Sequence, residues 1–188
     1  MRAAPILLVL LFASDPVRVP PDPGLYYVTP QGIEPVEAHS VTVEHTASKL
    51  PPLPMRGAMP MGSGSVRAEL LGDHADTELA STPVFYYRTA LDGDDERDGA
   101  GPADLVLVKL KSKRGRREFE LGGGSNSKAE WHPSSGISLK SQVRFNQKRV
   151  DRGLYRLLPA DDLDPGEYGF YQYRGRDLPG LLYDFSVD

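Results

Sequence analysis

The chain contains no cysteine in its 188 residues. This absence excludes disulfides, thiolate metal sites, cysteine nucleophiles and a lipid anchor on an N-terminal cysteine. Charge of one sign is not in large excess either, because 22 basic residues stand against 26 acidic ones. A mildly acidic surface gives no general reason to bind nucleic acid or anionic lipid. We therefore expect a domain held together by its core alone, and no nucleic-acid partner.

The sequence also lacks the signatures of common catalytic sites. It has no Gly-x-Ser-x-Gly elbow, no phosphate-binding loop and no zinc-protease motif. His39 and Ser40 are adjacent, but neighbouring residues on a strand point to opposite faces, so they cannot act as base and nucleophile. No pair of histidines has the spacing of a metal site; the four are His39, His45, His74 and His132. We expect no enzymatic activity, no resident metal and no cofactor.

The N-terminal residues have the pattern of an export signal. Arg2 precedes an apolar run over residues 3–13, which has signal-peptide length and a plausible cleavage point after Ala13. The run is too short to span a bilayer. We expect a signal peptide or short apolar anchor over residues 1–13, a proline-rich extended segment over 14–24, and one domain over 25–188. The protein would then be periplasmic, extracellular or held on the outer face of a membrane.

Short runs of alternating apolar and polar residues, separated by glycine and proline, follow the leader. No helical period longer than two turns is present, so the pattern favours an all-β fold, a single antiparallel β-sandwich. Residues 30–35 predict a turn-rich connection, and residues 105–111 predict a strand with one buried face and one wet face that bears Leu107. The expected strands are residues 25–29, 40–46, 66–71, 83–91, 105–111, 117–121, 137–145, 153–158, 168–173 and 181–187.

The turn before residue 168 is the most specific local signal. Pro165 fixes φ at a turn position, Gly166 supplies a positive φ, and Tyr168 opens a strand after Leu163. This spacing resembles the tyrosine corner of immunoglobulin-like and fibronectin type III domains. The resemblance implies a Tyr168 ring in the core and a hydroxyl bonded to upstream backbone.

The C-terminal half also resembles an uncharacterised family of secreted bacterial proteins. The resemblance rests on the Pro-Gly-Glu-Tyr-x-Phe turn at residues 165–170 and on the Tyr-Asp-Phe-x-Val-Asp ending at residues 183–188. It covers residues 106–188 and implies an exported β-sandwich without an assigned activity.

One acidic stretch has a pattern that can be compared with that of a calcium-binding loop. Asp94, Glu96 and Asp98 alternate before Gly99, as oxygen ligands do at the start of a calcium loop. The position that a closing glutamate would take is Leu105. A solvated acidic loop is the favoured interpretation.

Basic residues concentrate in one predicted hairpin over residues 109–117, whose turn is Lys113-Arg114-Gly115-Arg116. Glu118 and Glu120 can neutralise this charge across the strands. We therefore expect a solvated face here, with Arg117 in it, in preference to a site for an anionic polymer.

Aromatic residues are the remaining clue to function. Strand alternation cannot bury all of them, so we expect an interaction surface that includes Tyr86, Tyr87, Tyr171, Tyr173 and Trp131. The favoured function is a structural or accessory protein-binding component of an envelope, membrane-complex or extracellular assembly. The alternative is a carbohydrate-binding module in which Trp131 and tyrosines stack on sugar rings.

Overall fold

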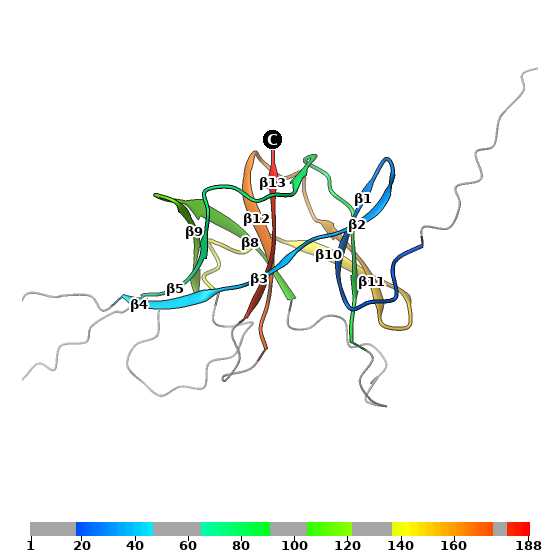
Figure 1. The fold of residues 1–188 in the computed structure, drawn as a ribbon, viewed down its shortest axis with the longest axis horizontal. Coiled ribbons are helices and arrows are strands. Elements are labelled where there is room, and N and C mark those ends of the chain that lie inside the picture. Colours follow the sequence, from blue (N-terminus) through cyan, green and yellow to red (C-terminus); the bar gives the residue numbers. More distant parts are fainter. Residues whose placement is uncertain (1–17, 47–64, 91–104, 122–136, 175–179) are drawn as a thin grey trace, which may run out of the picture.

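The computed structural model describes residues 18–46, 65–90, 105–121, 137–174 and 180–188, which form strands and the turns between them (Figure 1). These residues contain no helix, and so none long and apolar enough to cross a membrane. The predicted all-β class is confirmed. The strands are β1 (Gly24–Thr29), β2 (Gly32–Pro35), β3 (Ala38–Ser40), β4 (Thr42–Thr46), β5 (Ser65–Leu71), β6 (Glu78–Leu79), β7 (Phe85–Arg88), β8 (Leu105–Ser112), β9 (Arg116–Leu121), β10 (Phe145–Asp151), β11 (Leu154–Pro159), β12 (Gly166–Gln172) and β13 (Leu181–Val187).

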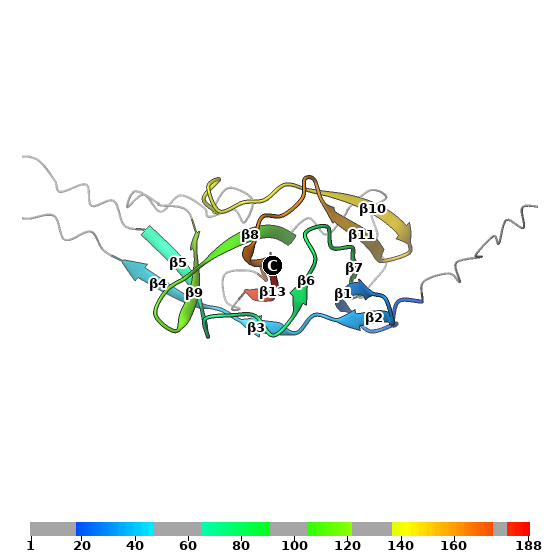
Figure 2. The ribbon, with the colours of Figure 1, turned by 90° about the horizontal axis from the view of Figure 1, so that it is seen from above.

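The strands form two sheets. The five-stranded sheet has the order β10-β11-β7-β1-β2, and the eight-stranded sheet has the order β3-β13-β12-β8-β9-β5-β4 with β6 beside β13. Neighbouring strands of these sheets run antiparallel, apart from β6, which is parallel to β13. Figure 2 shows the five-stranded sheet on the right and most of the eight-stranded sheet on the left. The strand β13 of the eight-stranded sheet lies near the centre of the view.

The eight-stranded sheet curls until its first and last strands meet. His39 of β3 pairs with Leu182 of β13, whereas Thr42 of β4 pairs with Glu69 of β5, and only Val41 separates β3 from β4. Residues 38–46 therefore connect the two ends of the eight-stranded sheet. We call this sheet the curled sheet. A separate hydrophobic cluster fills its inside: Val41, Ala68, Val108, Leu110, Phe119, Leu121, Ile137, Tyr171 and Leu182.

The strands β8, β12 and β13 are buried on both faces. Leu107, Phe170 and Phe185 point to the core shared with the five-stranded sheet and have no exposed surface. Their neighbours Val108 and Tyr171 point into the curled sheet. We expected one face of residues 105–111 to be exposed to solvent, and this prediction was wrong for Leu107. Alternation alone places Leu107 on the exposed face, but the five-stranded sheet covers that face.

The turn before β12 has the geometry that its sequence predicts. The ring of Tyr168 is buried and stacks on Phe185 at 5.8 Å between centroids, and its hydroxyl donates a 2.8 Å hydrogen bond to the carbonyl of Asp164. Gly166 has a φ of 149°, where a side chain would strain the backbone. Leu163, which precedes the turn, is also buried. The turn is therefore anchored in the core by Leu163 on one side and by Tyr168 on the other.

Residues 30–35 and 137–144 differ most from the sequence prediction. Residues 30–35 contain β2, which forms a hairpin with β1. Residues 137–144 form turns in place of the predicted strand, because they enter a gap where β8 and β9 diverge: the amide of Lys109 donates to Ser141 O at 2.8 Å, and the amide of Val143 donates to Leu107 O at 2.8 Å. The strand β10 therefore begins only at Phe145.

Candidate functional site

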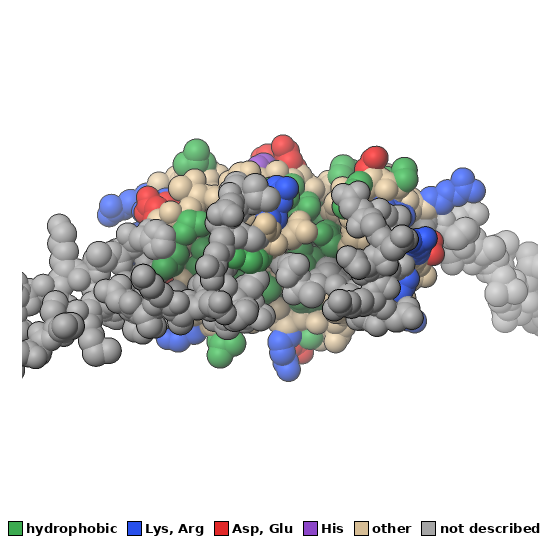
Figure 3. Space-filling model, turned by 90° about the horizontal axis from the view of Figure 1, so that it is seen from below, with side chains coloured by type: hydrophobic (Ala, Val, Ile, Leu, Met, Phe, Trp, Pro, Cys, Tyr) green, Lys and Arg blue, Asp and Glu red, His purple; other side chains and the backbone are tan. Residues whose placement is uncertain are grey.

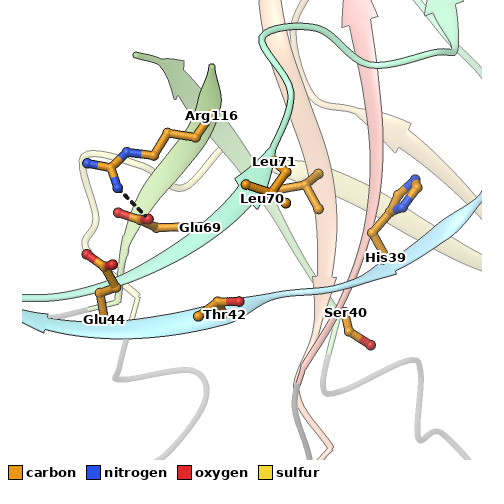
Figure 4. Close-up of a pocket in the computed structure, with 8 residues that line it drawn as sticks. All are labelled: His39, Ser40, Thr42, Glu44, Glu69, Leu70, Leu71 and Arg116. Atoms are coloured by element: carbon orange, nitrogen blue, oxygen red, sulfur yellow. Dashed lines mark hydrogen bonds and ion pairs between the residues drawn. The ribbon is translucent and has the colours of Figure 1, made fainter. Parts of the chain in front are cut away.

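A groove opens where the wall of the curled sheet divides. The chain of residues 38–46 pairs with β5 only from Thr42 onward, because β3 turns to pair with β13. Figure 4 shows β5 diverging from this chain, with Leu70 and Leu71 in the space between. The groove has a volume of about 590 Å³ and is lined by His39, Ser40, Thr42, Glu44, Glu69, Leu70, Leu71 and Arg116. We call it the fork groove.

The fork groove combines an apolar wall with carboxylates. Leu71 is 86% exposed, whereas Leu70 packs partly against the inside cluster. Glu69 is paired with Arg116 at 2.8 Å. Glu44 forms no ion pair within the described residues, since Arg67, opposite it in register, pairs with Glu118 at 3.3 Å. One carboxylate of the groove is therefore available to a positively charged group.

A buried cluster of charges lies beside this groove. Arg117 of β9, Glu167 of β12 and Asp184 of β13 are 5%, 8% and 4% exposed. A guanidinium nitrogen of Arg117 pairs with Asp184 and lies 3.4 Å from Glu167, and Arg117 Nε donates to the carbonyl of Gly72 at 3.2 Å. Burying charge is costly unless it is paired, so these three side chains must stay together.

Two histidines stand at the ends of this cluster. Nδ1 of the exposed His74 lies 3.1 Å from Glu167, and Nε2 of His39 lies 3.3 Å from Oδ1 of Asp184. This Oδ1 is buried and accepts no hydrogen bond within the described residues. His39 is half-buried and also lines the fork groove, so it connects the groove to the cluster.

Ser40 does not complete a catalytic triad with the His39–Asp184 pair. A His39–Asp184 pair resembles part of a hydrolase triad, but Ser40 points away from His39 along the strand (Figure 4). Arg117 occupies the space between Asp184 and Glu167, and no group of three or more histidines and acids in the described residues is arranged to hold a metal.

Two tyrosines predicted to form an interaction surface are buried instead. Tyr87 is 6% exposed, and its hydroxyl accepts a 2.8 Å hydrogen bond from Nε2 of Gln172. Tyr171 is 3% exposed and packs edge-on against Phe119 at 5.2 Å. Burial raises the pKa of Tyr171, and the nearby Tyr173 adds to the effect. The prediction failed for Tyr87 and Tyr171 because each points into one of the two cores.

The other predicted site residues divide into two groups. Tyr86 and Tyr173 are half-buried, so part of each side chain is exposed. Trp131 and the calcium candidates Asp94, Glu96 and Asp98 lie outside the described residues.

The buried charges were missed by sequence reasoning, although a signal for them existed. Glu167 belongs to the Pro-Gly-Glu-Tyr-x-Phe turn and Asp184 to the Tyr-Asp-Phe-x-Val-Asp ending, and each is an acid within a strand of buried neighbours. Arg117 was wrongly expected on a solvated face. It points inward because β9 places it beside Phe119 on the inside of the curled sheet, and Asp184 there compensates its charge.

Comparison with protein-family models, with curated protein sequences and with solved structures finds no match to this chain.

Proposed function

We propose that the protein is a non-enzymatic, protein-binding component of an exported assembly, and that the fork groove receives an extended segment of its partner. The observation that carries this proposal is the division of the curled sheet, where β3 leaves β5 and a groove of about 590 Å³ opens between them. That volume lies in the range of ligand-binding clefts.

The backbone of the groove favours an extended partner. β3 pairs with β13 along one edge, and β5 has diverged from its other edge. A strand edge without a neighbour offers backbone donors and acceptors to an incoming strand, and side-chain pockets beside it supply specificity. The bound segment would therefore run alongside β3.

The side chains of the groove suggest the chemistry of that segment. Exposed Leu71 presents apolar area, and Glu44 presents a carboxylate without an ion-pair partner in the described residues. A segment that carries an apolar residue next to a lysine or arginine would complement both.

The finer fold assignment and the compartment belong to the same proposal. The Tyr168 turn and the core that both sheets share support an immunoglobulin-like sandwich. The apolar run over residues 3–13 supports export, with periplasmic, outer-face or extracellular placement, and the two C-terminal motifs support membership of the secreted bacterial family.

Affinity capture with a matched pair of variants tests the proposal. Leu71 and Leu139 are 86% and 84% exposed, so Leu71→Arg and Leu139→Arg make the same change at similarly exposed sites, only one of which lines the groove. Tagged protein is used to capture partners from native membrane and medium fractions. We expect a stoichiometric protein partner with the wild type and with Leu139→Arg, and its loss with Leu71→Arg. Equal recovery with both variants would refute the fork groove as the site, and retention on glycan alone would refute a protein partner.

A further inference from the structure

A row of basic and aromatic side chains crosses the outer face of the five-stranded sheet. Lys148 of β10 pairs in register with Arg156 of β11, which in turn pairs with Tyr86 of β7. The residues next to Tyr86 in the chain, Phe85 and Tyr87, point into the shared core. Successive residues of a strand point to opposite faces, so this row points away from the core. We call Lys148, Arg156 and Tyr86 the cationic row.

The two cations of this row have no counter-charge among the residues that the structure describes. Like charges directly opposite each other on neighbouring strands destabilise a sheet. Lys148 and Arg156 are exposed, and neither forms an ion pair with a carboxylate of the described residues. By contrast, the nearby Arg144 is paired with Asp161 at 3.1 Å.

The segment that contains most of the row is richer in basic than in acidic residues. Residues 144–161, which include β10 and β11, contain five basic and two acidic residues, although the whole chain has a formal net charge of −4. In Figure 3, Lys and Arg side chains lie at the right-hand end of the molecule, where Figure 1 places the five-stranded sheet, and also at the left-hand end and the lower edge. A basic patch on an acidic protein steers negatively charged partners toward one face.

The other half of the same face is already occupied. The side chain of Arg88 donates to the carbonyl of Pro20 at 2.7 Å, and the hydroxyl of Tyr26 donates to the carbonyl of Asp22 at 2.8 Å. The lead-in residues 18–22 therefore lie over β1 and the end of β7. The available area is the part that contains the cationic row.

We propose that the cationic row docks a protein surface that presents neighbouring carboxylates. The row is short, whereas a protein on nucleic acid commonly neutralises about 6–10 phosphates. Arginine and tyrosine are the residue types that interfaces between proteins favour. The row lies on the five-stranded sheet and the fork groove on the curled sheet, so this proposal stands independently of the groove.

Binding of the full-length protein to a labelled peptide of ten glutamates, followed by fluorescence anisotropy at low and high salt, tests the row. We expect Lys148→Glu/Arg156→Glu to bind about tenfold more weakly at low salt, because two exposed ion pairs are replaced by repulsion. The control Lys113→Glu/Arg114→Glu makes the same charge change in the exposed β8–β9 turn and should bind within about twofold of wild type.

Three outcomes would overturn the proposal. The first is the same affinity in both double variants. The second is tighter binding to a sulfated oligosaccharide or to vesicles with anionic lipid than to the peptide, which would assign the row to another class of partner. The third is a concentration-dependent dimer, seen by analytical ultracentrifugation and lost in the row variant, which would assign it to a second copy of the chain.

Discussion

Replacing Arg117 by methionine should destabilise the protein by about 3–5 kcal/mol, because it removes one partner from a buried charge pair. Methionine retains much of the aliphatic volume of arginine, so the change acts mainly on charge. Asp184 and Glu167, 4% and 8% exposed, would then lie buried without the guanidinium that joins them. Because the free energy of unfolding of a single domain is about 5–15 kcal/mol, this loss is a large share of the protein's total stability.

Arg116 provides a matched control on the same strand. It pairs with Glu69 at 2.8 Å on the outside of the curled sheet, and its side chain is 37% exposed. An ion pair at that exposure contributes about 0–1 kcal/mol, so Arg116→Met should cost no more than that.

Urea unfolding followed by far-ultraviolet circular dichroism measures both losses. Joint replacement of Arg117, Glu167 and Asp184 by apolar residues of similar volume should cost less than Arg117→Met alone, because no buried charge is then left unpaired. A loss in Arg117→Met equal to that in Arg116→Met would refute the reasoning, since the cluster would then be solvated.

Three further predictions concern the two cores and their tyrosines. Tyr168→Phe removes the 2.8 Å hydrogen bond to Asp164 and should lower the free energy of unfolding by about 1 kcal/mol, measured by urea titration. Gly169→Ala would place a Cβ 2.8 Å from Leu182 and should cost about 1–3 kcal/mol by overpacking, measured as a lower urea midpoint. Burial raises the pKa of Tyr171 and of Tyr183 above the ordinary 10.0, so both favour the neutral phenol in the folded state. Their contribution to stability should be complete below pH 10.0 and should disappear as pH rises through the folded-state pKa values; a flat unfolding free energy in that alkaline range would contradict this.

Much of the fold follows from local signals in the sequence. Period-two alternation identified most strands because each has at least one apolar face, and glycine and proline mark the turns between them. The turn at Pro165 and Gly166 was predictable because its backbone requirements are local, and Tyr168 takes the position that this turn sets. The β8–β9 turn was predictable for the same reason: Arg114 and Gly115 have φ of 50° and 82°, as a tight hairpin requires.

The parts that could not be predicted depend on distant segments. Leu107 and Tyr171 belong to strands that are buried on both faces. The neighbouring sequence does not indicate that a second core packs against these strands. In the sequence, Arg117 has the pattern of an exposed cation. Only the pairing of distant strands brings Glu167 of β12 and Asp184 of β13 beside it. Lys148 and Arg156 are eight positions apart, and only the hairpin register sets them opposite each other.

The most direct test of the proposed function is site-specific photo-crosslinking in the native host. A photoreactive phenylalanine analogue is placed at position 71, in the fork groove, or at position 139, at an equally exposed leucine outside it. We predict that one partner protein crosslinks from position 71 and not from position 139. A protein that crosslinks equally from both positions, or only from position 139, would contradict the fork groove as the place where this protein binds.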